Sequence, residues 1–190
     1  MGTTIRDDRA VAAPTTRGTV FVVTGPSGAG KTTVGRLLAR SFERGVHLEG
    51  DVFRRSIVSG RQEMTPDPSR EALTQLELRY RVAAAAVDQY AGAGFAAVLE
   101  DVIAPPMLGE IATLVRARPL HVVVLLPRPE VVATRDAARA SSGYARWSVE
   151  ALHELFAART PRIGLWLDTS EQTPEQTVAV ILAGAAYAPF

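Results

Sequence analysis

A glycine-rich stretch, GPSGAGKTT at residues 25–33, places the strongest constraint on how this chain folds. The run TVFVVT precedes it and a helical pattern from Val34 to Phe42 follows it, so the motif G-x-x-x-x-G-K-[ST] lies between a strand and a helix. Glycines let successive backbone N–H groups approach phosphate oxygens, and the N-terminus of the helix adds partial positive charge. The stretch therefore predicts a P-loop (Walker A) that binds a nucleoside triphosphate.

The side chains of this predicted loop have separate tasks. Lys31 would reach the β- and γ-phosphates, and the Thr32 hydroxyl would ligate Mg²⁺. The chain has 21 basic residues, of which Lys31 is the only lysine, and a flexible point charge suits a position that must meet phosphate. The residues expected around the nucleotide phosphates are Gly25, Ser27, Gly28, Ala29, Gly30, Lys31, Thr32 and Thr33.

Apolar runs alternate with helical patterns along the rest of the chain. Five runs, at 19–24, 46–49, 95–99, 120–126 and 163–167, have the composition of buried strands. Helical patterns separate them, including one to about residue 44 that would end at Gly45. A long one is begun by Asp67 and Pro68, and its buried stripe would consist of Leu73, Leu76, Tyr80, Ala83 or Ala84, Val87 and Tyr90. This alternation predicts an α/β fold with a three-layer, doubly wound parallel sheet of five strands.

Length and composition restrict the remaining alternatives. The 190 residues predict a single domain over 18–187, after a flexible tail at 1–17. A formal net charge of +1 gives no reason to expect nucleic acid as a partner, and no apolar run reaches the length of a membrane span. The N-terminus lacks the apolar segment of a secretory signal, and the absence of cysteine excludes disulfides. We expect a cytoplasmic monomer or homodimer.

Carboxylates follow the second and third predicted strands, at the sheet edge where ligands of such folds bind. Asp51 would orient a hydroxyl nucleophile, although capping of the following helix alone would also explain it. Of Glu100 and Asp101 only one should face the phosphates, because side chains alternate along a strand. We expect Asp101 to contact Mg²⁺ and substrate; the alternative is a carboxylate that merely ends the strand.

Arginines near this edge form the second group of candidates. Arg54 lies one helical turn after Asp51 and would place a positive charge at the same edge of the sheet. Arg135 and Arg139 lie four residues apart on one predicted helix, ahead of the flexible stretch 141–143, and would close as a small helical lid over a transferring phosphoryl group. A solvated charged face is the alternative for each lid arginine.

Three segments together resemble the small-molecule kinases of the P-loop nucleotide-kinase-like fold. These are GPSGAGKTT, then LEGDVFR at 48–54, then the arginine-bearing segment near residue 135. LEGDVFR looks like the LDGDxxR stretch of adenylylsulfate kinases, and LWLDTSEQTPEQTV at 165–178 is similar to their C-terminal strand–loop–helix. The size and the position of Asp51 also look like chloramphenicol phosphotransferase and tunicamycin-resistance-type proteins. The resemblance covers about residues 18–185 and implies the strand order 2-3-1-4-5.

The resemblance also implies roles for particular residues. Asp51 would face the acceptor hydroxyl, Arg54 would contact an acceptor with an anionic group, and the loop around Thr169 would pass near adenine. The implied activity is ATP- and Mg²⁺-dependent transfer of phosphate to a hydroxyl of a small molecule, such as an antibiotic or nucleoside-like compound.

Four other functions are compatible with or close to the motifs of this sequence. An adenylylsulfate-kinase-like enzyme of primary metabolism and a regulatory ATPase remain as alternatives. A GTPase is disfavoured because the chain has no asparagine for a guanine-reading N-K-x-D motif, and a dinucleotide-binding enzyme because the glycine order is not G-x-G-x-x-G.

Overall fold

The computed structural model describes residues 18–103, 107–137, 148–160 and 162–185. The predicted tail at 1–17, Arg139 and the rest of the 138–147 segment lie outside these described residues. None of the helices in the described part is long and apolar enough to cross a membrane.

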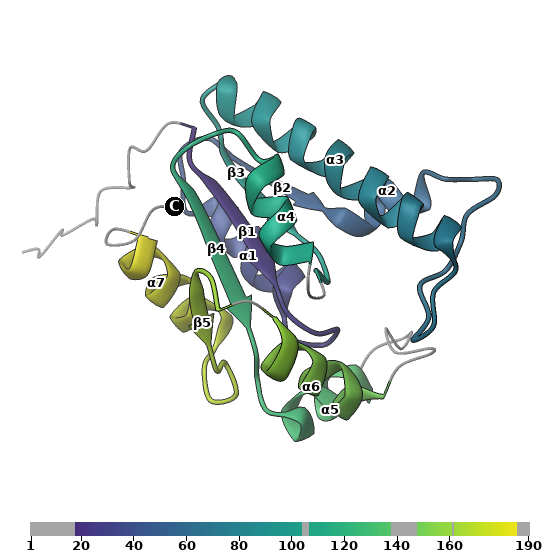
Figure 1. Cartoon of the computed structure of the whole chain (residues 1–190). Coiled ribbons are helices and arrows are strands. Elements are labelled where there is room, and N and C mark those ends of the chain that lie inside the picture. Colours follow the sequence, from purple (N-terminus) through teal and green to yellow (C-terminus); the bar gives the residue numbers. More distant parts are fainter. Residues whose placement is uncertain (1–17, 104–106, 138–147, 161, 186–190) are drawn as a thin grey trace, which may run out of the picture.

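Five parallel strands form one sheet through the centre of the molecule (Figure 1). They are β1 (Val20–Thr24), β2 (Gly45–Glu49), β3 (Ala96–Glu100), β4 (Leu120–Leu125) and β5 (Leu165–Leu167). Their order is β2-β3-β1-β4-β5, and each neighbouring pair is parallel. The predicted α/β fold class and strand order are therefore confirmed.

Seven helices connect or flank these strands in the described part of the chain. They are α1 (Lys31–Arg40), α2 (Gly50–Arg55), α3 (Arg70–Gly92), α4 (Met107–Leu114), α5 (Pro129–Ala137), α6 (Val149–Arg159) and α7 (Pro174–Ala185). In Figure 1, α2 lies next to the N-terminal half of α3, at the β2 side of the sheet.

Two apolar cores cover the two faces of the sheet. On one face, Tyr80 and Val87 of α3 and Ile111 of α4 pack with sheet residues such as Val22 and Leu99. On the other face, α1 and α7 pack against the alternate residues of the same strands. Burial on both faces explains why the central strands read as continuous apolar runs rather than alternating ones.

Helix α3 begins two residues later than the sequence indicated. Ser69, not Asp67, is its N-cap, and the Ser69 hydroxyl accepts a hydrogen bond from the Ala72 N–H at 3.1 Å. The buried stripe also differs from the prediction, because Leu73 and Tyr90 are 42% and 41% exposed. Ala83 and Ala84, of which the sequence predicted one or the other, are both buried in the stripe. Ala72 and Ala91 join them, and these small side chains bring the long helix close to the sheet.

The prediction that α1 extends to about residue 44 and ends at Gly45 is wrong. The helix ends at Arg40, and Gly45 already belongs to β2. A Cβ at residue 45 would lie 1.8 Å from the Ala39 carbonyl oxygen. Gly45 is therefore required where the chain passes close to the end of α1, rather than as a helix cap.

The carboxyl ends of the strands bring the predicted ligand-binding segments to one edge of the sheet. The P-loop follows β1, Asp51 follows β2, and Glu100 and Asp101 lie at the end of β3. Thr169 follows β5 on the other side of the P-loop. In parallel α/β sheets this edge is where ligands bind.

Candidate active site

Three glycines of the P-loop adopt backbone conformations that other residues avoid. The φ angles of Gly25, Gly28 and Gly30 are 144°, 77° and 92°. A Cβ on Gly25 would lie 2.1 Å from the Leu125 carbonyl oxygen, so the loop can leave β1 beside β4 only with glycine there. A Cβ on Gly30 would meet nothing within 4 Å, which leaves open space beside the start of α1. These glycine conformations are those of a loop that can close on an anion.

The start of α1 has no side chain that satisfies its N-terminal N–H groups. Gly30 is the N-cap, no side chain makes a capping hydrogen bond, and the first turn has no acidic residue. The Lys31 ammonium is buried and donates a hydrogen bond to the Pro26 carbonyl oxygen at 2.9 Å, so it lies across the loop. A helix N-terminus without a cap, together with a lysine held over it, is suited to bind phosphate.

Glu100, rather than Asp101, is the carboxylate that contacts the P-loop. The Thr32 hydroxyl donates a hydrogen bond to Glu100 Oε1 at 2.9 Å. Burial raises the pKa of the Glu100 carboxyl above its ordinary value, although the charge of Lys31 and the Thr32 hydrogen bond act in the opposite direction. The expectation that Asp101 faces this loop differs from the structure, since β3 continues to Glu100 and directs that side chain toward Thr32.

Asp101 instead forms a buried ion pair with helix α3. Its Oδ2 lies 3.0 Å from Arg79 Nη2, and the Val102 N–H donates to its Oδ1 at 2.7 Å. The side chains of Asp101 and Arg79 are 8% and 10% exposed. A Cβ on Gly50 would lie 2.1 Å from Asp101 Oδ2, so glycine at the start of α2 gives this carboxylate its space. Asp101 thus links the end of β3 to α3 through its ion pair with Arg79, and it packs against the start of α2 at Gly50.

Asp51 lies in the first turn of α2 but does not cap it. Glu49 is the N-cap, and the Asp51 carboxylate accepts hydrogen bonds from Arg54 Nε at 2.7 Å and from Arg55 Nη1 at 2.5 Å. Burial would raise the pKa of the Asp51 carboxyl, but the Arg54 hydrogen bond and the charges of Arg54, Arg55 and Arg79 together hold that pKa below its ordinary value. Asp51 is therefore ionised at neutral pH and held in a fixed orientation.

A cavity of about 280 Å³ lies on the other side of the P-loop. Gly28 and Gly30 line it together with Thr169, from the segment after β5, and Arg135 of α5. Arg135 Nη2 donates to the Thr169 carbonyl oxygen at 3.2 Å. The Thr169 hydroxyl is buried and has no hydrogen-bond partner in the described part of the chain. The two predicted residues are thus brought together at one cavity beside the phosphate-binding loop.

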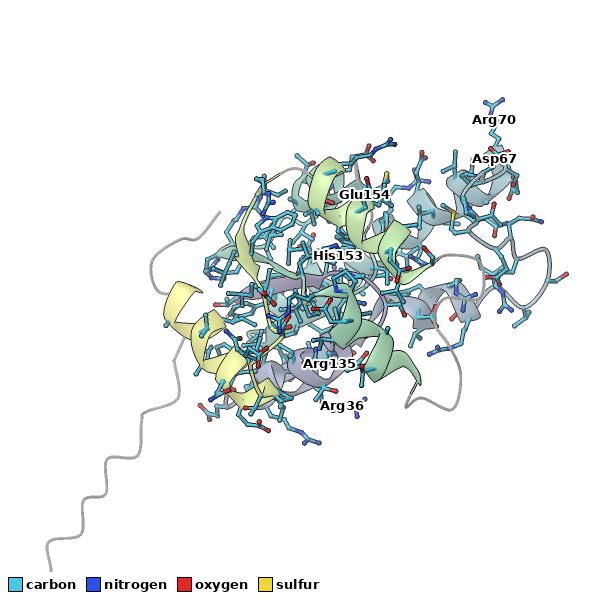
Figure 2. The ribbon with its side chains drawn as sticks, turned by 90° about the horizontal axis from the view of Figure 1, so that it is seen from below. Arg36, Asp67, Arg70, Arg135, His153 and Glu154 are labelled. Carbon is cyan, nitrogen blue, oxygen red and sulfur yellow. The ribbon has the colours of Figure 1, made fainter. Side chains whose placement is uncertain are left out.

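Figure 2 shows that Asp67 and Arg70 lie apart from Arg135 in the molecule. Arg135 lies on α5 near the centre of the view, whereas Asp67 and Arg70 lie at the outer end of α3. Asp67 is exposed and therefore belongs to neither the P-loop nor the cavity. Exposed residues at that end are suitable controls for substitutions in the site.

Oxygen ligands suited to Mg²⁺ are present beside the P-loop. Within the described residues, no group of three or more His, Asp or Glu side chains could hold a metal ion by itself. Mg²⁺ does not need such a cage, because it is commonly held by one or two protein oxygens, water and substrate phosphates. Thr32 Oγ1 and Glu100 Oε1 lie next to each other, and both are oxygen atoms that can coordinate a metal ion, so they fit that pattern.

Replacing Glu100 by glutamine tests whether Glu100 helps to hold Mg²⁺. We expect two opposite effects: weaker binding of MgATP and greater stability of the fold. The variant keeps the Thr32 hydrogen bond and loses a buried charge, so we expect Mg²⁺-dependent ATP affinity to fall about 10- to 100-fold. Because burial raises the pKa of Glu100 in the folded state, its ionisation destabilises the fold as pH rises through that pKa.

The variant should therefore resist urea better than the wild type at pH 7, and this difference should vanish below the ordinary pKa of glutamate. Titration calorimetry with MgATP and urea unfolding at several pH values measure the two effects. Unchanged MgATP affinity in Glu100→Gln would contradict the assignment.

Sequence reasoning missed several contributors to this edge. Arg79 is one arginine among several on α3, and only the tertiary packing places it on Asp101. Glu63 lies in the loop before α3, and both its carboxylate oxygens accept from Arg54 Nη1 at 2.8 Å. Neither residue has a local motif. For Glu100 there was only a weak indication in the sequence: it lies beside Asp101 at the end of the third predicted strand, and either side chain could have faced the phosphates.

Several solved structures have the same fold as this chain. A sugar kinase from Janibacter sp. HTCC2649 is 22% identical and superposes with a TM-score of 0.68, covering 90% of this chain and 96% of that one. The tunicamycin resistance protein of Deinococcus radiodurans is 16% identical with a TM-score of 0.67, covering 91% and 98%. An APS kinase of Mycobacterium tuberculosis is 13% identical with a TM-score of 0.58, covering 90% and 99%. At these identities the likeness establishes the fold, which is that of P-loop kinases.

A search of curated proteins gave no match to this sequence. The model of one protein family does match, over residues 20–162, a range that begins at β1 and includes the P-loop, Asp51, Glu100 and Arg135. Since this is more than half of the sequence, the chain belongs to the AAA domain family AAA_33.

Proposed function

We propose that this chain is an ATP-dependent phosphotransferase that moves the γ-phosphate to a hydroxyl of a small molecule. The observation that carries the proposal is the arrangement at the sheet edge: the P-loop with Lys31 and Thr32 lies next to Glu100, and Asp51 follows the neighbouring strand β2. A phosphate-binding loop flanked by an ionised, oriented carboxylate is what transfer to a hydroxyl requires.

The residues of the donor half divide into three groups. The P-loop backbone and Lys31 would bind the triphosphate, while the cavity of Arg135 and Thr169 would accept the nucleoside. Thr32 and Glu100 would hold Mg²⁺, which supplies charge neutralisation at the phosphate oxygens when bound. A lid role for Arg135 and Arg139 over the transferring group remains part of the proposal.

Asp51 is the proposed acceptor-side group. It would accept a hydrogen bond from the acceptor hydroxyl and take its proton as the new O–P bond forms and the bond between the γ-phosphorus and the ADP oxygen breaks. The lowered pKa of Asp51 suits this role, because the carboxylate is ionised at neutral pH. A strong base is not needed, since bond formation to the hydroxyl oxygen lags in a loose transition state and the proton leaves late.

The finer proposal concerns the kind of acceptor. An antibiotic or nucleoside-like compound is supported by the shared fold with a tunicamycin resistance protein, and a sugar by the shared fold with a sugar kinase. An adenylylsulfate-kinase-like activity has the corresponding support from the APS kinase.

Acceptor-dependent release of ADP tests the proposed function. Purified full-length protein is supplied with MgATP and separate panels of sugars, nucleosides and antibiotics, and ADP is followed with a coupled enzyme assay. We expect at least one compound to raise the rate well above hydrolysis in water. Tight ATP binding with an ADP rate that no compound changes would favour a regulatory ATPase instead.

A further inference from the structure

The outer face of α3 carries residues at the spacing of a helix–helix contact. Leu78, Val82, Ala85, Gln89 and Gly92 follow one another at intervals of four, three, four and three residues. This spacing places them on a single stripe along the helix, as in a coiled-coil seam. All five residues are exposed, and the two large apolar side chains, Leu78 and Val82, are 47% and 45% exposed. We call this set of residues the outer stripe.

The outer stripe is not the face of α3 that packs on the sheet. Tyr80 and Val87 belong to the core, and at about 100° per residue they lie on the opposite side of the helix from Ala85. Figure 1 shows α3 at the outside of the molecule. A surface helix normally has polar residues on the side away from its core. The apolar residues of the outer stripe therefore indicate a second surface that α3 can bury.

A groove of about 590 Å³ runs along one flank of the outer stripe, between α3 and the end of α4. Arg81, Ala85, Asp88 and Gly92 line it on the α3 side. The Asp88 carboxylate is anchored, because its Oδ1 accepts a hydrogen bond from the Arg116 N–H at 3.0 Å. The Arg81 guanidinium is exposed and has no ion pair or hydrogen bond within the described residues. This flank thus presents a cation and an anchored anion that lie about two helical turns apart.

We propose that a second copy of this chain packs on the outer stripe, with the two α3 helices antiparallel and a two-fold axis at Ala85. Around such an axis, a residue that precedes Ala85 lies opposite the residue of the partner that follows Ala85 by the same number of positions. Ala85 itself faces the partner's Ala85, and two small side chains at this point let the helices approach closely. The inference does not depend on the proposed phosphotransferase function.

The two ends of the outer stripe fit each other by size in this arrangement. Leu78 precedes the axis by seven residues and Gly92 follows it by seven, so Leu78 lies opposite the partner's Gly92. A Cβ on Gly92 would meet nothing within 4 Å, so there is space at this position for a leucine side chain from the partner. Val82 comes level with the partner's Gln89, whose methylene groups can cover it while the amide stays at the rim. Each large side chain therefore meets a residue that can accommodate it.

The charges beside the groove also complement each other across this axis. Arg81 lies four residues before the axis and Asp88 three residues after it, on the same flank, so Arg81 comes beside the partner's Asp88. The two-fold symmetry repeats this pair at the other end of the interface. A parallel pair would instead set like charges level with each other and would leave Gly92 facing a gap. Size and charge therefore both favour the antiparallel pair.

The oligomeric state of the full-length protein is the first test. We expect sedimentation equilibrium to show a dimer with a Kd of about 1–100 μM, because two helices and a groove make an interface at the small end of the usual range. A protein that remains monomeric at concentrations of about 500 μM would overturn the proposal.

The variant Ala85→Glu tests where the interface lies. It places two carboxylates face to face on the axis, and glutamate is a good helix former at an exposed position. We expect dimerisation at least about 100-fold weaker than in the wild type, with unchanged MgATP affinity because the outer stripe faces away from the sheet. Val180→Glu, the same kind of change at a 38% exposed residue of α7, should dimerise as the wild type does. A dimer that persists in Ala85→Glu uses another surface, and the proposal would then be wrong.

Introduced cysteines test the antiparallel axis, since the chain has none of its own. Under mild oxidation, Ala85→Cys should form a disulfide-linked dimer, because residue 85 meets its own copy. Leu78→Cys and Gly92→Cys should cross-link when the two variants are mixed and hardly at all when each is alone. Val180→Cys should not cross-link. Self-linkage of Leu78→Cys and of Gly92→Cys at the rate of their mixture would indicate a parallel pair and contradict the arrangement, as would an Ala85→Cys variant that does not link.

The variant Arg81→Glu tests the charge pair. It sets a carboxylate beside the partner's Asp88 at two places in the dimer, so we expect dimerisation to weaken about 10-fold or more. Arg70→Glu makes the same charge reversal at the outer end of the same helix (Figure 2), away from the outer stripe, and should dimerise as the wild type does. Equal dimerisation of Arg81→Glu and Arg70→Glu would refute the pairing of Arg81 with Asp88.

Discussion

Replacing Lys31 by alanine is expected to lower phosphoryl transfer by about a thousandfold or more. The Lys31 ammonium lies over the P-loop, on the Pro26 carbonyl oxygen at 2.9 Å, and would move onto the phosphates when ATP binds. In the proposed reaction its charge would offset the negative charge that develops between the leaving ADP and the transferring group. The measurement is kcat with the accepted compound, together with MgATP affinity by calorimetry.

Two further variants make this result interpretable. Arg36→Ala removes a positive charge from the same helix, but its side chain is 55% exposed and pairs with Glu49, so we expect normal transfer. Lys31→Arg should remain strongly impaired, because a planar guanidinium does not replace a compact ammonium at a phosphate. Transfer near the wild-type rate in Lys31→Ala, with an intact fold, would show that the P-loop is not the donor site.

Replacing Asp51 by asparagine is expected to lower kcat by about 10²- to 10⁴-fold while ATP still binds. Asparagine preserves size and can still accept from Arg54, so the orientation of α2 is kept. It cannot take the proton of the acceptor hydroxyl. Because the arginine contacts overcome the effect of burial and lower the pKa of Asp51, the wild-type rate should stay flat through neutral pH and fall only when the pH is acidic enough to protonate this carboxyl.

Asp67→Asn is the matched control for Asp51→Asn. Asp67 is exposed and lies at the outer end of α3, away from Arg135 and its cavity (Figure 2), so the same chemical change there should leave kcat and its pH profile unaltered. If Asp51→Asn turns over near the wild-type rate with the true acceptor, Asp51 is not the group that receives the proton.

Local sequence signals were sufficient for the fold class, whereas the strand order was implied by the family resemblance. The P-loop motif fixed β1 and α1 as neighbours, and continuous apolar runs such as Leu120–Leu125 identified buried parallel strands. The segment before α7 shows how far such signals reach. Thr173 and Gln176 have the spacing of a capping box and form one: the Thr173 N–H donates to Gln176 Oε1 at 2.9 Å, and the Gln176 N–H donates to Thr173 Oγ1 at 3.2 Å. These features depend on neighbouring residues alone.

Signals that depend on where a strand ends were less reliable. The alternation rule showed that Glu100 and Asp101 face different ways, but not which of them faces Thr32. That choice is made by the extension of β3 to Glu100, by its pairing with Val23 of β1, and by the space that Gly50 leaves for Asp101. All three are tertiary features.

The acceptor side could not be predicted from local patterns. Glu63 and Arg54 are nine residues apart in a polar loop and a short helix, and Arg79 meets Asp101 from the middle of a long helix. Ion pairs between distant segments leave no periodicity or spacing to find. The structure therefore changes the interpretation of Arg54 from a free anion-binding group to one that Asp51 and Glu63 already occupy.

The fate of the γ-phosphate tests the central claim most directly. Full-length protein is incubated with MgATP and the compound that raises ADP release most, and the reaction is followed by ³¹P NMR. The account predicts that the γ-phosphate signal is replaced by an equal amount of phosphate monoester, with proton coupling that identifies the modified hydroxyl, and that Asp51→Asn forms almost none. Conversion of the γ-phosphate only to inorganic phosphate, at a rate independent of the compound, would contradict it.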